Sequence, residues 1–209
     1  VNSLAVGSKE VYASTGSSVI VYNLEFDELR KLSKVNGLTE TGISTIAWSE
    51  ESEALIIAYQ STNLDLVMSN TIYNIPDISR KYIPGKKEIN RVRTKGSYAY
   101  LACSFGIVII DLGKREIRDT WKPGNGNEDT EVWDIAFGYG KIYAATGMGL
   151  FSAGITDPGL SYFGNWLVEN RLPNPHGKYT AALFSGDRLY ANRSGQSFTG
   201  DSVYVIETG

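Results

Sequence analysis

An internal repeat limits the possible folds of this chain more than any other feature. Each copy has a strand-like segment, a short polar turn and a second strand-like segment, followed by a turn into a third. Equivalent apolar residues, called anchor residues below, are 42, 46, 43 and 47 positions apart: Leu4, Ile46, Val92, Ile135 and Ala182. A period of about 40–50 residues with several short strands per repeat is typical of β-propellers.

This period predicts an all-β chain, a β-propeller built of about five four-stranded blade repeats. One four-stranded blade has two apolar faces that it cannot cover by itself, so blades stack side by side around an axis. Five repeats could close a small ring or belong to a larger one, and we favour part of a larger propeller. We expect one propeller domain or fragment over residues 1–209, with repeats near 1–42, 43–88, 89–131, 132–178 and 179–209.

The strands within a repeat are expected to differ in polarity. The runs Leu55–Ile57 and Val108–Ile110 are apolar without alternation, which predicts strands buried on both faces. The fourth strand of each repeat is an edge and is therefore expected to be polar. Candidates for it are residues 29–34, 72–75, 117–121 and 161–168. No segment keeps a 3.6-residue apolar period for about 10–12 residues, so no helix is predicted.

Composition argues against several classes of partner. The net charge is −3, with 20 Lys and Arg against 23 Asp and Glu, so the basic surplus of a nucleic-acid-binding protein is lacking. No apolar run approaches the roughly 18 residues that a membrane-spanning helix needs. The only Cys and His, Cys103 and His176, cannot form an internal disulfide or a Cys/His zinc site. No cofactor is predicted.

The chemistry-bearing residues do not predict an enzyme. His176 lies in a loop rich in Pro and Gly without a recognisable nucleophile nearby, although a hydrolytic triad needs both. Cys103 lies in an apolar strand, where a free Cys is usually a buried packing residue. Asp134 is the one acidic residue at the expected inner-strand positions, whereas glycosidases need two carboxylates. No catalytic residue is therefore predicted.

Three residues on the expected inner strands are candidates for ligand binding: Trp133, Asp134 and Arg91. Propellers present ligand groups around the axis, near the ends of their inner strands. A Trp side chain can stack on a sugar ring or anchor a protein interface, but packing between blades is the favoured interpretation for all four Trp residues. The acidic stretch 124–129 lacks the ligand spacing of a calcium loop, so no metal site is predicted.

Several stretches resemble known bacterial propellers. Asn36-Gly37-Leu38-Thr39 resembles the junction between blades in the propellers of two-component regulators, and Asn170–Pro173 is a looser copy, with Arg171 where that family has Gly. Residues 142–151 resemble a blade core of the same family. Further stretches resemble the PorZ-type propeller proteins of the Bacteroidetes type IX secretion system: Asn63–Val67, Ile72–Ile78 and Ala99–Val108. The resemblance runs from Val1 to about Trp166 and is to the amino-terminal part of a longer protein.

The resemblance implies a binding function without catalysis. PorZ-type proteins have two propellers and a small β-domain, lie at the cell surface, and take part in exporting and anchoring cargo proteins. By resemblance, we expect an exported protein of the cell surface or periplasm that acts in type IX secretion and surface attachment. Its partners would be proteins of the secretion and sortase complex or a surface lipopolysaccharide. The alternative is the periplasmic sensor of a hybrid two-component regulator that recognises an oligosaccharide.

Overall fold

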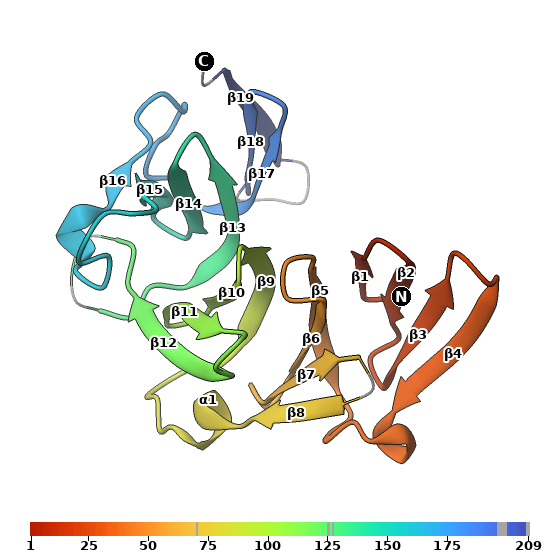
Figure 1. The fold of residues 1–209 in the computed structure, drawn as a ribbon. Helices are drawn as coiled ribbons and strands as arrows, with labels where there is room; N and C mark the ends of the chain where they lie inside the picture. The colour runs from red at the N-terminus through yellow and green to blue at the C-terminus, as the bar shows by residue number, and fades with distance from the viewer. Residues whose placement is uncertain (70, 125, 127, 196–199, 208–209) are drawn as a thin grey trace. The chain divides into compact units, whose positions relative to one another are not determined.

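The structure, a computed structural model, describes residues 1–69, 71–124, 126, 128–195 and 200–207. Its strands form five sheets, and within each sheet the strands that follow one another in sequence are neighbours (Figure 1). The first two sheets contain β1 (Ser3–Val6), β2 (Glu10–Ser14), β3 (Ser18–Asn23) and β4 (Glu28–Ser33), then β5 (Ile43–Ser49), β6 (Ala54–Tyr59), β7 (Leu64–Met68) and β8 (Thr71–Ile75). The next two contain β9 (Ile89–Lys95), β10 (Tyr98–Cys103), β11 (Gly106–Asp111) and β12 (Glu116–Trp121), then β13 (Val132–Gly138), β14 (Lys141–Thr146), β15 (Gly149–Gly154) and β16 (Leu167–Val168). The fifth has three described strands, β17 (Tyr179–Ser185), β18 (Arg188–Arg193) and β19 (Ser202–Glu207). The expected all-β fold with about five blade-type sheets is confirmed.

Chain contacts divide the molecule into two compact units. Unit 1 contains Val1–Leu101 and Ile109–Arg118, and unit 2 contains Ala102–Val108 and Asp119–Gly209. The division passes through the third sheet. The buried apolar residues of the first and second sheets form one cluster in unit 1, and those of the fourth and fifth sheets form another in unit 2. Each cluster therefore joins the facing sides of two consecutive sheets, as stacking of blades requires.

The central strands are the most buried part of each sheet. All six residues of β6 are buried, and so are the first five residues of β11, including the apolar runs Leu55–Ile57 and Val108–Ile110. The absence of alternation in these runs follows from burial on both faces, as predicted. The outer strands β4 and β12 are polar and largely exposed, which agrees with their place at an edge.

The outer strand of the fourth sheet is much shorter than its sequence predicts. Residues 161–168 were expected to form it, but the strand is limited to Leu167–Val168. The residues before it bond locally instead. The amide of Tyr162 donates to the carbonyl of Gly159 at 2.9 Å, and the indole Nε1 of Trp166 donates to the carbonyl of Leu160 at 2.9 Å. These bonds fold the segment onto itself and leave few backbone groups for β15.

A one-turn helix, α1 (Asp77–Arg80), was not predicted, and short 3-10 helices occupy Lys34–Asn36 and Phe163–Asn165. Four residues are too few to show an apolar period, so α1 leaves no such signal in the sequence. Ile78 is the buried residue of this helix. The ammonium group of Lys87 donates to the carbonyls of Ile78, Ser79 and Lys81, at 3.4, 2.8 and 3.2 Å, so it satisfies the carbonyls at the end of the helix.

A pair of aromatic rings joins consecutive sheets in both units. In unit 1, Tyr12 of β2 stacks on Trp48 of β5, with ring centres 5.3 Å apart and planes 19° apart. In unit 2, Tyr143 of β14 meets Phe184 of β17, with ring centres also 5.3 Å apart. Each Tyr lies eight residues after its own anchor, and each partner lies two residues after the anchor of the next sheet. The same contact is therefore made twice by equivalent positions of the repeat.

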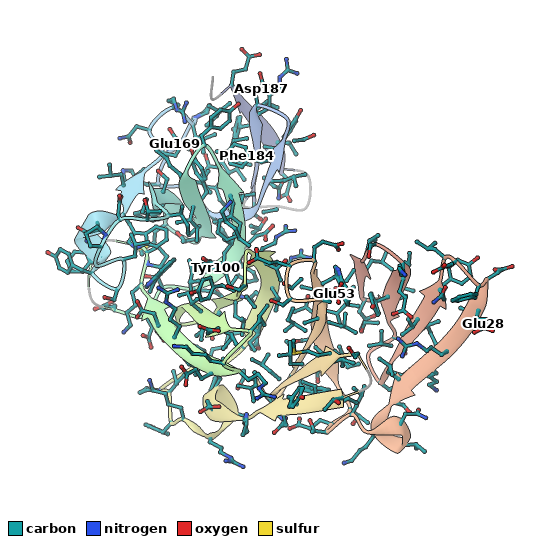
Figure 2. The ribbon with its side chains drawn as sticks, viewed as in Figure 1. Glu28, Glu53, Tyr100, Glu169, Phe184 and Asp187 are labelled. Atoms are coloured by element: carbon teal, nitrogen blue, oxygen red, sulfur yellow. The ribbon has the colours of Figure 1, made fainter. Side chains whose placement is uncertain are left out.

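A glycine leaves room for the partner ring in both contacts. A Cβ atom at Gly7 would lie 2.9 Å from the nearest ring atom of Trp48, and one at Gly138 would lie 2.5 Å from the ring of Phe184, which Figure 2 labels. Both glycines follow their anchor by three residues. Contacts this short are repulsive, so any larger residue would have to push the ring and its sheet away.

We predict that Gly138→Ala destabilises the protein by about 1–3 kcal/mol, because the new methyl group overlaps the ring of Phe184. Urea unfolding measures this change. Gly147→Ala is the matched control in the same sheet, because a Cβ atom there meets nothing within 4 Å. The control is expected to stay within about 0.5 kcal/mol of the unmodified protein. Equal stability of the two variants would contradict the proposed crowding.

Candidate functional site

The first strands of the first three sheets all belong to unit 1 and line a hollow of about 310 Å³. Its walls come from β1, β5 and β9, which are the inner strands of the expected blades. Leu4 and Val6 of β1 are exposed apolar residues there, Trp48 contributes its half-buried ring, and Arg91 and Arg93 come from β9. The hollow is therefore apolar on one side and cationic on the other.

The two arginines lie on the same face of β9. Side chains alternate along a strand, so residues 91 and 93 point to one side and Val92 to the other. Val92 is buried, whereas Arg91 is exposed and Arg93 is half-buried. Both arginines also interact with other groups of the protein. Asp and Glu do not occur among the described residues that line the hollow, so its charged groups favour an anionic ligand group.

The residue just before each anchor can link one inner strand to the next, and we call it the bridging position. In the first sheet it is Ser3, whose hydroxyl oxygen accepts a hydrogen bond from the backbone amide of Ile46 at 3.3 Å. Ile46 is the anchor of the following sheet. A second bond between the same sheets joins the hydroxyl groups of Ser3 and Thr45, the next bridging residue, at 3.4 Å.

Asp134 occupies the bridging position in unit 2 and makes the equivalent contact. Its carboxylate accepts from the amide of Ala182, the next anchor, at 3.4 Å, and from its own neighbour Ile135 at 2.8 Å. The side chain is 2% exposed. The described bonds of Asp134 thus hold β13 to β17, and the predicted role in ligand binding stays a prediction.

Arg91 holds the bridging position of the third sheet but cannot do what Ser3 and Asp134 do. A guanidinium group carries only donors, so it cannot accept a bond from a backbone amide. Its side chain is exposed at the hollow instead. Arg91 therefore does not accept an anchor amide as Ser3 and Asp134 do, and it remains a candidate for ligand binding.

Trp133 lies at an irregularity of β13, where the register with β14 shifts. The same shift occurs in β5 and β17, where Ser44 and Thr180 take the extra place and bond within their own sheets, to the carbonyl of Ala58 at 3.0 Å and to Asn192 at 2.9 Å. A bulge redirects the side chain that occupies it. The half-buried Trp133 ring is covered by the ammonium group of Lys178, 4.3 Å from the ring centre.

The three predicted ligand residues are distributed over both units. Trp133 and Asp134 are neighbours on β13 in unit 2, whereas Arg91 belongs to β9 in unit 1. The bridging role of Ser3 and Asp134 was not predicted from the sequence. The repeat alignment carried that signal, because hydrogen-bond acceptors precede the anchor in three copies: Ser3, Thr45 and Asp134.

The two residues considered as catalytic candidates, Cys103 and His176, are not among the residues that line the hollow. Cys103 is buried, and burial raises the pKa of its thiol, which disfavours the reactive thiolate. His176 is exposed in the loop before β17. Within the described ranges, no group of three His, Cys, Asp or Glu side chains could hold a metal ion. Asn125 and Asn127 of the acidic stretch lie outside the described residues. Among the described helices, none is long and apolar enough to cross a membrane.

The sequence matches one family description over most of its length. Residues 11–167 fit the N-terminal β-propeller domain of PorZ, a component of the type IX secretion system. The chain belongs to the PorZ N-terminal β-propeller family. The propeller fold expected from the repeat is thereby confirmed, and the family agrees with the resemblance noted in the sequence. Among curated proteins, no match to the sequence was found.

Solved structures share this fold at low sequence identity. PorZ of Porphyromonas gingivalis, described as an essential bacterial surface component of the type IX secretion system, matches with a TM-score of 0.78 and 22% identity over 97% of this chain. The extracellular domain of BT4673 from B. thetaiotaomicron, described as a one-component system, matches with a TM-score of 0.68 and 11% identity over 96% of this chain. AztD of Citrobacter koseri matches with a TM-score of 0.54 and 18% identity. The match covers 74% of this chain and 44% of the AztD chain. The chain covers 27% of that PorZ chain and 26% of BT4673, so it spans about a quarter of each.

We predict that Asp134→Ala lowers the free energy of unfolding by about 1–3 kcal/mol, because it leaves the buried amide of Ala182 without its acceptor. Asp134→Asn keeps an acceptor oxygen at the same place and is expected to lose less than half as much. Both variants are compared with the unmodified protein by urea unfolding. If the alanine and asparagine variants are equally stable, the bond from Ala182 does not stabilise the pair of strands.

Proposed function

We propose that this chain is the non-catalytic propeller of an exported protein that acts in type IX secretion and surface attachment. The observation that carries the proposal is the family match over residues 11–167. The P. gingivalis relative is described as an essential bacterial surface component of that system. The proposed location is accordingly the cell surface or the periplasm.

The proposed activity is binding of partner proteins of the secretion complex or of surface lipopolysaccharide. The hollow with Arg91 and Arg93 supports the second of these partners. A guanidinium group presents two parallel donors that match the geometry of a phosphate or carboxylate group. Such groups are the anionic parts of a lipopolysaccharide, and the exposed Leu4 and Val6 offer apolar contact beside them.

Likeness to the BT4673 extracellular domain supports a second candidate, a propeller that senses an oligosaccharide. The identities of 11% and 14% to its two structures show the fold alone. Deletion of the gene is expected to have different effects for the two candidate functions. A secretion component affects export and attachment of cargo proteins, whereas a sensor affects transcription of its target genes.

Gene deletion and complementation in the native host test the proposal. We expect deletion to abolish export and surface attachment of cargo proteins, measured by immunoblotting of cell-surface and medium fractions. Complementation with the unmodified gene restores both. Complementation with Arg91→Gln and Arg93→Gln together is expected to reduce attachment at least fivefold, because the hollow loses its cationic groups. Arg80→Gln on α1, an exposed arginine outside the hollow, is the matched control and should restore attachment fully.

Two results would count against this function. Normal export and attachment in the deletion strain would overturn the role in secretion, and altered transcription of glycan-use genes in that strain would favour the sensor. Full complementation by the double arginine variant would leave the role in secretion but remove the hollow as its binding site. The level of each variant protein is measured by immunoblotting, so that loss of folding is not mistaken for loss of binding.

A further inference from the structure

A second concave site lies between the first and second sheets of unit 1, with a volume of about 350 Å³. We call it the interblade groove. Its lining includes the segment from Gly7 to Glu10, Arg30 on the outer strand β4, and Glu53, which directly precedes β6 and is labelled in Figure 2. Its volume is near the lower end of the range of small-molecule pockets, about 300–1,000 Å³.

The polar groups of the groove are held in fixed positions. Arg30 Nη2 donates to both carboxylate oxygens of Glu10, at 3.1 and 3.0 Å, and the hydroxyl of Tyr12 donates to the same carboxylate at 2.7 Å. The hydrogen bonds described for Arg30 use Nη2 alone, so the donors on Nε and Nη1 are available to a ligand. Asn23 accepts two backbone amides through Oδ1, from Glu25 and Phe26, which orients its Nδ2 donor.

An aromatic wall completes the groove. Trp48 is half-buried and stacks on Tyr12, and its Nε1 donates to Glu50 at 2.7 Å. This bond and the stacking hold the indole ring in one orientation. A fixed aromatic ring offers apolar area to the C–H face of a sugar at little cost in side-chain entropy, while hydroxyl groups bond to the donors and acceptors around it.

The charges of the groove balance. Lys9 and Arg30 are the described cations of its lining, and Glu10 and Glu53 are the described anions. Glu10 is already paired with Arg30, and Lys9 lies 3.6 Å from Glu25. A charged ligand would meet repulsion from one sign as well as attraction from the other. An uncharged ligand with many hydroxyl groups uses both donors and carboxylates, as a neutral sugar does.

We propose that the interblade groove binds neutral sugar residues, one or two rings at a time. The groove shares Trp48 with the inner-strand hollow but does not include the two arginines of the hollow, and the proposal goes beyond the role in secretion. Binding is measured on purified protein, whereas export is measured in cells, so either idea can fail without the other.

A comparable set of residues recurs in unit 2, in a hollow of about 470 Å³. Arg171 donates through Nε and Nη2 to the two oxygens of Glu169, at 2.8 and 2.9 Å, beside Tyr143. These bonds lower the pKa of Glu169, which Figure 2 labels. Exposed Lys141 adds a second cation to this lining, so its charge does not balance. The proposal is therefore confined to the groove of unit 1.

The test is a titration of the purified protein labelled with 5-fluorotryptophan, followed by ¹⁹F NMR. The resonance absent from Trp48→Phe identifies Trp48. Four probes are used separately: maltotriose, cellotriose, mannotriose and triacetylchitotriose. We expect at least one of them to shift the Trp48 resonance in a saturable way, with a Kd of about 1 mM, which corresponds to about −4 kcal/mol.

Two variants locate the binding. Arg30→Met removes the donors of the groove and is expected to weaken binding about tenfold. Lys31→Met is the matched control on the same strand, because Lys31 pairs with Ile20 on the opposite face, whereas Arg30 pairs with the buried Val21. Circular dichroism checks that both variants are folded. Absence of a saturable shift with all four sugars at about 10 mM, tenfold above the expected Kd, overturns the proposal. Equal affinities of the two variants overturn it as well.

Discussion

Covering the apolar faces of consecutive sheets is the constraint on which the rest of this structure depends. A single blade exposes two such faces, and the hydrophobic effect favours any arrangement that removes them from water. In both units the contact is made by a Tyr of one sheet and an aromatic ring of the next, with centres 5.3 Å apart. Gly7 and Gly138 allow this close approach because any side chain there would occupy the space of the ring.

Hydrogen bonds between inner strands fix how the packed sheets are aligned with one another. Apolar contact alone permits neighbouring sheets to slide, whereas a bond from an anchor amide to the bridging residue selects one register. Ser3 and Asp134 provide this bond with different chemistry, a hydroxyl and a carboxylate. Arg91 at the equivalent position cannot accept such a bond, because its guanidinium group carries only donors.

The two concave sites on unit 1 differ in the ligand that their charges favour. The inner-strand hollow has Arg91 and Arg93 beside apolar residues and suits an anionic group. The interblade groove has paired charges and a fixed aromatic wall and suits uncharged hydroxyl groups. A surface glycan carries both kinds of group. Family membership connects the chain with type IX secretion, and these sites are the parts of the surface through which binding is proposed to occur.

The sequence by itself determined the fold class, because anchor spacing, apolar runs such as Leu55–Ile57 and polar outer strands all follow from local pattern and burial. It also indicated Trp133, Asp134 and Arg91 as inner-strand residues, but not their different environments. Only the tertiary structure decided that Asp134 is buried against the amide of Ala182 and that Arg91 is exposed at a hollow. It alone brought Trp48, Tyr12 and Arg30 to one groove and left only Leu167–Val168 of the expected outer strand. The reason is physical. The periodicity of a strand depends on neighbouring residues and can be seen in the sequence, whereas contacts between sheets join residues about 40 positions apart. Those residues meet only after the blades have packed.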